Sequence, residues 1–146
     1  MRTLKHWLHR RQRPERYARL AELLATQGLS REKLLDKQRR DLHDIVRFAA
    51  ENTGFYRERY GALAGGFAGD ITRLPFLHKA DVVAHLPEML ARGNDPQRTK
   101  IGHTGGSTGK PLAFYYDEAK HELMRAGMMR SYMLSGWRPG QKILNF

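Results

Sequence analysis

Residues 104–111 read Thr-Gly-Gly-Ser-Thr-Gly-Lys-Pro, and they lie between two strand-like segments, 99–103 and 112–116. Glycine allows a backbone to turn tightly and to point several N–H groups at one anion. Three hydroxyl side chains and one lysine add donors and a positive charge. A phosphate group is the simplest ligand for this set, although a hairpin loop without a ligand is a competing interpretation.

The segment does not fit the Walker-A loop, G-x-x-x-x-G-K-[ST]. Gly109 and Lys110 match its G-K pair, but Thr104 stands where the first glycine belongs. Pro111 replaces the hydroxyl residue that would bind magnesium. A strand-like segment follows where the Walker-A loop requires a helix, so a different kind of phosphate loop is indicated.

The order of these residues resembles the phosphate-binding loop of the adenylate-forming (AMP-binding) enzymes, which include acyl-CoA synthetases, luciferases and peptide-synthetase adenylation domains. Two positions resemble one branch of this family, which contains phenylacetate-CoA ligase and the CapK-like proteins of capsular polysaccharide biosynthesis. These positions are Gly105, and Leu112 where many other members have a lysine. Residues 45–57 and 70–81 resemble segments of the same branch, with Gly54 in place of a usual proline. The resemblance runs from about residue 31 to the end.

The resemblance implies an α/β fold in which N-terminal helices precede the first strands and the first helix of an adenylate-forming large domain. The expected division is a basic helical extension, 1–30, followed by the N-terminal part of that domain, 31–146. A strand is expected to begin at Lys142 and to reach Phe146 without a partner strand. We therefore expect an incomplete large domain, the N-terminal fragment of a longer protein of about 400 residues.

The implied reaction joins a small-molecule carboxylate to ATP, releases pyrophosphate, and then transfers the acyl group to a thiol. The implied cofactors are ATP, Mg²⁺ and coenzyme A. The family places its acidic magnesium ligand and several nucleotide-binding motifs further along the chain. No catalytic or metal-binding residue is therefore assigned, and the fragment alone is expected to be inactive. The expected ATP-binding residues are Thr104, Gly105, Gly106, Ser107, Thr108, Gly109 and Lys110.

Composition leaves an alternative open. The net charge is +11, and residues 1–60 hold 15 Lys and Arg against 8 Asp and Glu. A basic protein that binds nucleic acid or an anionic surface would have such a charge, although a solvated arginine-rich helix is the simpler interpretation. Trp7 and Leu8 among basic residues leave weak membrane contact open. No nucleic-acid module is recognised, so no specific nucleic-acid partner is expected. A non-catalytic CapK-like relative is a further alternative.

The absence of cysteine and of a secretory signal or membrane-spanning segment is compatible with a cytoplasmic protein.

Apolar spacing predicts helices at 14–27, 31–52, 79–91 and 118–135, with Pro87 dividing the third. Ser30 and Asp117 are predicted N-caps, and 61–69 is predicted as a loop. The last helix is expected to bury Leu123, Met124, Gly127, Met128, Tyr132 and Met133. Phe55 and Tyr56 are interpreted as core residues, and His78, Lys79 and Asp81 as helix-capping residues. His103 is interpreted as a packed residue at a strand end, with contact to a nucleotide or acyl group as the alternative.

Overall fold

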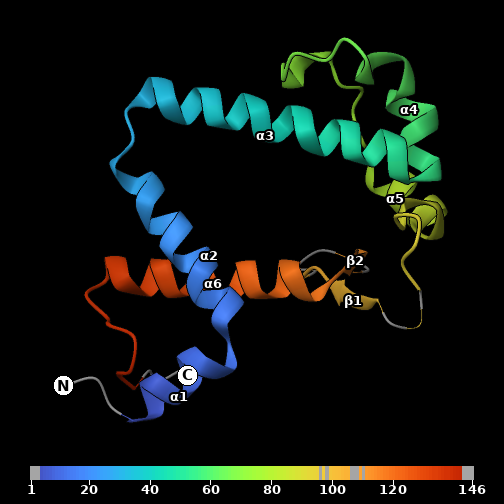
Figure 1. The fold of residues 1–146 in the computed structure, drawn as a ribbon. Coiled ribbons are helices and arrows are strands. Elements are labelled where there is room, and N and C mark those ends of the chain that lie inside the picture. The colour runs from blue at the N-terminus through green and yellow to red at the C-terminus, as the bar shows by residue number, and fades with distance from the viewer. Residues whose placement is uncertain (1–3, 96, 98, 106–108, 110, 143–146) are drawn as a thin grey trace. The chain divides into compact units, whose positions relative to one another are not determined.

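The computed structural model describes residues 4–95, 97, 99–105, 109 and 111–142. The chain forms two compact units, one made of Met1–Leu29 with Asp117–Phe146 and the other of Ser30–Tyr116. The described residues are mostly helical, with a two-stranded sheet (Figure 1). The predicted division between residues 30 and 31 concerns family domains and stays a prediction. No described helix is long and apolar enough to cross a membrane.

The first unit contains helices α1 (Leu4–Gln12), α2 (Pro14–Ala25) and α6 (Glu118–Leu134). Pro14 occupies the first turn of α2, where its missing N–H costs nothing. A short 3₁₀ turn, Thr26–Gly28, ends this helix close to the predicted position. Asp117 caps α6, since its side chain accepts a 2.7 Å hydrogen bond from the Lys120 amide. Helix α2 packs against α6 (Figure 1).

The prediction for the buried face of α6 is wrong. The side chains that are buried are Glu122, Ala126 and Met129, which share one face at spacings of four and three residues. Leu123, Met124 and Met128 are 45%, 49% and 39% exposed. The remaining predicted positions, Gly127, Tyr132 and Met133, are intermediate in exposure. Apolar residues surround most of this helix, so their pattern did not select one face. The buried face contains a carboxylate, which apolar spacing cannot predict.

The second unit begins with α3 (Arg31–Asn52) and α4 (Gly54–Ala64), which pack against each other. Ser30 caps α3 as predicted, with its hydroxyl 3.4 Å from the Lys33 amide. Thr53 ends α3 and caps α4, because its hydroxyl accepts from the Tyr56 amide at 3.1 Å. Helix α4 extends to Ala64, so the prediction of a loop at 61–69 is wrong for its first four residues.

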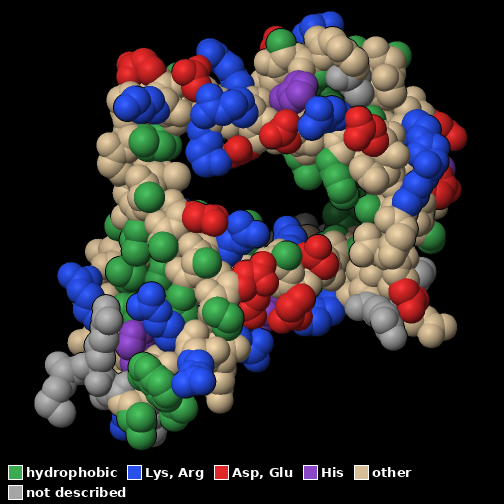
Figure 2. Space-filling view, viewed as in Figure 1, with side chains coloured by type: hydrophobic (Ala, Val, Ile, Leu, Met, Phe, Trp, Pro, Cys, Tyr) green, Lys and Arg blue, Asp and Glu red, His purple; other side chains and the backbone are tan. Residues whose placement is uncertain are grey.

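The core of this unit is formed by Val46, Ala50, Tyr60 and Phe67, with Leu42, Tyr56 and Leu74 packed against it. Phe55 is also buried, as predicted. Opposite charges pair locally along α3, for example Lys37 with Asp41 at 2.7 Å and Arg39 with Asp36 at 3.3 Å. Lys and Arg side chains lie among Asp and Glu side chains over this part of the surface (Figure 2). Most of the charge on α3 is thus a solvated helical surface.

The remaining elements of this unit are a 3₁₀ turn at Ile71–Arg73, helix α5 (Lys79–His85), a second 3₁₀ turn at Leu86–Met89, and strands β1 (Lys100–His103) and β2 (Ala113–Tyr116). The change from α5 to the 3₁₀ turn just before Pro87 confirms the predicted interruption. A strand was predicted from Lys142 to Phe146. Only Lys142 belongs to the described residues, so this prediction stays untested.

Candidate functional site

The candidate phosphate loop connects an antiparallel hairpin. Strands β1 and β2 pair in the register Lys100↔Tyr116 to His103↔Ala113. The pairing continues by one residue, because Thr104 and Leu112 form two hydrogen bonds. The Thr104 amide donates to the Leu112 carbonyl at 2.9 Å, and the Thr104 hydroxyl accepts from the Leu112 amide at 3.0 Å. Residues 105–111 therefore form the connection between two fixed ends.

The predicted site residues fall into two groups. Thr104, Gly105 and Gly109 are described, and all three are exposed. Gly106, Ser107, Thr108 and Lys110 lie outside the described residues, so their predicted contacts with phosphate stay predictions. The described part fits a phosphate ligand in two respects: it is open to solvent, and nothing lies within 4 Å of a Cβ built on Gly105. A small anion could therefore approach the backbone there.

Gly102 on β1 lies directly under the ring of Phe114 on the paired strand. A Cβ built there would lie 2.7 Å from Cζ of Phe114, its partner in the register. The Phe114 ring thus occupies the space that a side chain would need. His103, the next residue, is exposed at the end of β1, beside the loop. Its predicted role as a packed strand-end residue is therefore not the arrangement observed.

Replacement of Thr104 by valine tests whether its hydroxyl closes the loop. Valine has a similar shape but cannot accept the hydrogen bond from the Leu112 amide. We expect the Leu112 amide to exchange with solvent about five times faster, because a hydrogen bond of this kind contributes about 1 kcal/mol. Amide hydrogen exchange measured by NMR gives the rate directly.

Thr104→Ser keeps the hydroxyl and is the matched control, so it should retain the wild-type exchange rate. Equal exchange rates in Thr104→Val and the wild type would show that the side chain does not close the loop.

The residues around α5 have structural partners. Asp81 accepts a 2.9 Å hydrogen bond from the His78 amide, which confirms the predicted capping interaction. Its carboxylate also lies 3.5 Å from the guanidinium of Arg59. Arg59 donates in addition to the Phe76 carbonyl and lies over the Phe55 ring. These contacts connect α4 to the start of α5 and leave Asp81 with a packing role.

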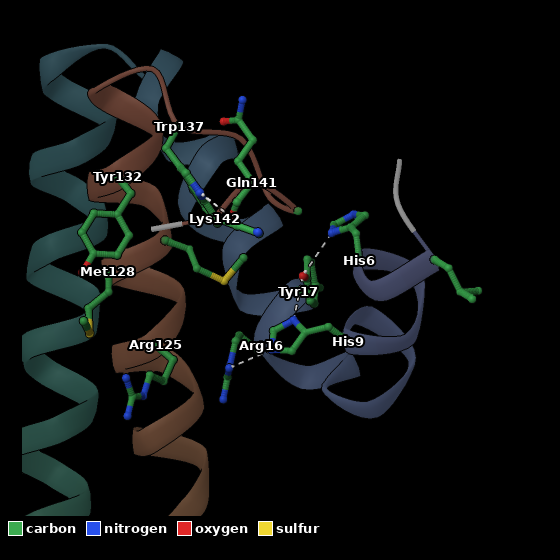
Figure 3. Close-up of a pocket in the computed structure, with 13 residues that line it drawn as sticks. His6, His9, Arg16, Tyr17, Arg125, Met128, Tyr132, Trp137, Gln141 and Lys142 are labelled. Carbon is green, nitrogen blue, oxygen red and sulfur yellow. Dashed lines mark hydrogen bonds between the residues drawn. The ribbon is translucent and has the colours of Figure 1, made fainter. Parts of the chain in front are cut away.

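The first unit contains a polar network that sequence reasoning missed. Glu122 is 4% exposed, and its two carboxylate oxygens accept from Arg16 at 2.7 and 3.0 Å. Arg16 also lies 3.3 Å from Nε2 of His9, and Nδ1 of His9 lies 2.9 Å from the Tyr17 hydroxyl (Figure 3). The same hydroxyl lies 3.4 Å from Nδ1 of His6.

Burial and charge shift the pKa values in this network. The hydrogen bond from Arg16 lowers the pKa of Glu122 from its ordinary value, against the opposing effect of burial. Burial, with the nearby Arg16 charge, lowers the pKa of His9 and favours a neutral ring. Burial raises the pKa of Tyr17. The network therefore combines a carboxylate–guanidinium pair with the ring of His9 and the hydroxyl of Tyr17.

No sequence signal connects these residues, because Arg16 and Glu122 are separated by 106 positions. The arginines near the N-terminus looked like a solvated basic surface, and Tyr17 looked like one member of an apolar face. Within the described part of the chain, no group of three or more His, Asp or Glu residues is placed to hold a metal ion. A magnesium site is not formed by these residues.

Comparison with known proteins gives one informative similarity. Over 122 residues the chain is 31% identical to a phenylacetate-coenzyme A ligase from Thermus thermophilus, and the match covers 80% of this chain. It covers 27% of the ligase, so the chain spans about a quarter of the length of that relative. No protein-family profile and no solved structure matches. The similarity supports a relation to the adenylate-forming enzymes over part of their length.

Proposed function

We propose that this chain is part of a carboxylate–CoA ligase of the adenylate-forming type, and that residues 104–111 bind the phosphates of ATP. The observation that carries the proposal is the hairpin closed by Thr104 and Leu112, in which the described residues Thr104, Gly105 and Gly109 are exposed. The similarity to phenylacetate-coenzyme A ligase over 122 residues supports it independently.

Each residue type in the loop would have a specific task. Backbone N–H groups at the glycines would donate to phosphate oxygens. The Thr104 hydroxyl uses its oxygen to accept from Leu112, so its own hydrogen remains available for donation to phosphate. Ser107 and Thr108 would add hydroxyl donors, and Lys110 a positive charge. This part of the protein would thus act through positioning and electrostatic stabilisation.

The cofactors of the intact protein would be ATP, Mg²⁺ and coenzyme A. The described residues fit a phosphate ligand but form no magnesium site, so the ion would need ligands from the nucleotide and from residues elsewhere. ATP bound with Mg²⁺ supplies the activated phosphate that a carboxylate attacks. We propose a cytoplasmic location and a small-molecule carboxylate as substrate.

We also propose that the CapK-like branch is related to this chain, on the basis of Gly105 and Leu112.

The alternative of a basic nucleic-acid-binding protein is less well supported, because several N-terminal arginines make contacts within the first unit. Arg13 and Arg16 pair with Glu122, and Arg19 pairs with Glu15 and Glu22. Arg10 and Arg11 lie over the rings of Tyr17 and Trp7. These contacts leave the net charge of +11 unchanged, but they hold the five arginine side chains against other residues of the chain.

Titration of the 146-residue chain with Mg-ATP tests the proposal. We expect Lys110→Ala to weaken binding about tenfold, which is the effect of losing one charge-assisted hydrogen bond. Lys100→Ala removes the same charge from β1 outside the loop, and it should weaken binding by less than about threefold. Isothermal titration calorimetry at 150 mM salt measures both affinities.

The same variants separate the two functions. A nucleic-acid-binding protein would bind single-stranded DNA with an affinity that falls steeply with salt and is unchanged by Lys110→Ala. Equal weakening of Mg-ATP binding by Lys100→Ala and Lys110→Ala would contradict a specific phosphate loop.

A further inference from the structure

Helix α1 has one face that packs within the first unit. His6 on this face is 7% exposed, and His9 is partly buried. Their rings meet the ring of Tyr17 on α2 edge-on, with centroids 5.6 and 5.7 Å apart. The two histidines are three positions apart, so they lie on the same side of the helix. Their contact with α2 therefore determines which side of α1 faces outward.

The outward side of α1 is apolar and open to solvent. Leu4, Trp7 and Leu8 are 71%, 52% and 41% exposed. They lie at spacings of three and one residues, which places them in one stripe along the helix. With about 3.6 residues per turn, this stripe lies opposite His6 and His9. Adjacent large apolar side chains that are exposed in this way are typical of an interaction surface.

Positive charge adjoins the apolar stripe. Residues 1–14 contain five Lys and Arg residues and no Asp or Glu. Arg10 and Arg11 are exposed, and the Arg11 guanidinium lies 5.3 Å from the centre of the Trp7 ring. These three residues, with His6, line a hollow of about 620 Å³. Hydrophobic and basic side chains thus lie next to each other over α1 (Figure 2).

We propose that α1 binds the surface of an anionic phospholipid bilayer, with its apolar stripe at the boundary between headgroups and acyl chains. An indole ring suits this boundary, because it has an apolar body and a polar N–H. Arg10 and Arg11 pair with lipid phosphates, which occur all over such a surface, so the two guanidinium groups do not need to reach one ligand. The Arg11 stem follows the Trp7 ring while its charged head stays among the phosphates.

The apolar stripe favours a bilayer over the other possible partners. Nucleic acid would pair with the arginines but would leave Leu4 and Leu8 exposed to water. A second copy of the chain would bring the same arginines together without a carboxylate between them, which is unfavourable. The proposal is independent of the function of residues 104–111.

Co-sedimentation of the 146-residue chain with lipid vesicles tests the role of the charge. We expect binding to vesicles of phosphatidylglycerol and phosphatidylcholine in equal parts, and binding at least about tenfold weaker to phosphatidylcholine alone. Arg10→Gln/Arg11→Gln should weaken binding to the anionic vesicles at least about tenfold. Lys120→Gln/Arg125→Gln removes two exposed cations from α6 and is the matched control, with an expected change of less than about threefold.

A second pair of variants tests the apolar stripe at constant charge. Trp7→Ser/Leu8→Ser should weaken binding to the anionic vesicles at least about tenfold, because two large apolar side chains no longer leave water. Leu134→Ser removes a leucine that is 75% exposed at the end of α6. This control should bind like the wild type. Circular dichroism checks that all these variants keep their helices.

Trp7 also reports insertion directly. The chain contains two tryptophans, so Trp137→Phe leaves Trp7 alone. We expect the emission of this variant to shift to shorter wavelength with the anionic vesicles, as the indole leaves water. Vesicle binding without this shift, or equal binding by Trp7→Ser/Leu8→Ser and the wild type, would show adsorption by charge alone and overturn the proposal.

Two further results would assign the face to another partner and overturn the proposal. One is binding of a single-stranded oligonucleotide without binding to vesicles. The other is a dimer in sedimentation velocity that Trp7→Ser/Leu8→Ser abolishes, again without binding to vesicles. Lys110→Ala should bind vesicles within about threefold of the wild type, so failure of the phosphate-loop proposal and failure of this one would give different results.

Discussion

Glu122→Ala is expected to lower the free energy of unfolding of the first unit by about 3 kcal/mol. The carboxylate is buried on α6 and accepts two hydrogen bonds from Arg16, whose side chain is 13% exposed. Removal of one partner leaves the guanidinium without compensation in a poorly solvated place, which costs more than the pair itself contributes. Urea unfolding followed by tryptophan fluorescence measures the change, because Trp137 packs against the same core.

Glu118→Ala is the matched control on the same helix. Glu118 lies 3.8 Å from Arg13, and its side chain is 53% exposed. An exposed pair of this kind contributes about 0–1 kcal/mol. Equal destabilisation by the two substitutions would show that burial of Glu122 is not decisive. Replacing both Glu122 and Arg16 by Leu and Met should recover much of the stability lost in the single variant.

The ion pair of Glu122 with Arg16 also predicts how the free energy of unfolding changes with pH. The folded-state pKa of Glu122 is lowered from its ordinary value of 4.5. Its contribution to stability is therefore fully present above about pH 4.5 and is lost as the pH falls through the lower folded-state pKa. As the pH falls below about 4.5, the wild type should lose more stability than Glu122→Ala, which no longer has this group. A parallel loss in both proteins would contradict the assignment.

Gly69→Ala is expected to destabilise the second unit by about 3 kcal/mol or more. Gly69 has φ of 81°, and a Cβ built there would lie 2.5 Å from the Arg39 carbonyl oxygen. The left-handed conformation costs an alanine about 1–2 kcal/mol, and the overlap with α3 backbone adds a similar amount. The contact is with backbone, so a side-chain rotation cannot relieve it. Urea unfolding followed by circular dichroism of the helices measures the effect.

Gly66→Ala provides the comparison within the same segment. Gly66 has no positive φ, and nothing lies within 4 Å of its built Cβ. Alanine there should be neutral or slightly stabilising, because it restricts the unfolded chain. Equal tolerance of alanine at both glycines would contradict the close contact between Gly69 and the backbone of α3.

Local signals in the sequence predicted much of the fold. Ser30 and Asp117 mark the starts of α3 and α6, and Pro87 marks the interruption after α5, because a cap or a proline acts within a few residues. The two strands on either side of the loop were also predicted, whereas their antiparallel pairing is a finding of the structure.

Non-local features were not predicted. The buried face of α6 depends on Arg16, a residue 106 positions away from Glu122, and a buried ion pair has no apolar periodicity. Helix α4 was missed in part because Gly61 suggested a loop, whereas packing of Tyr60 against α3 outweighs the low helix propensity of glycine. The hydrogen bonds between Thr104 and Leu112 define the ends of the candidate loop, and no feature of the sequence predicted them.

The most direct test of the central claim is to map tripolyphosphate binding on the chain by NMR. Inorganic tripolyphosphate is titrated into the isotope-labelled 146-residue protein, and amide shifts are assigned by residue. The largest shifts are expected within residues 104–111, and they should be lost in Lys110→Ala. Shifts confined to the basic segment 10–19, or unchanged shifts in the Lys110→Ala protein, would contradict a phosphate-binding role for this loop.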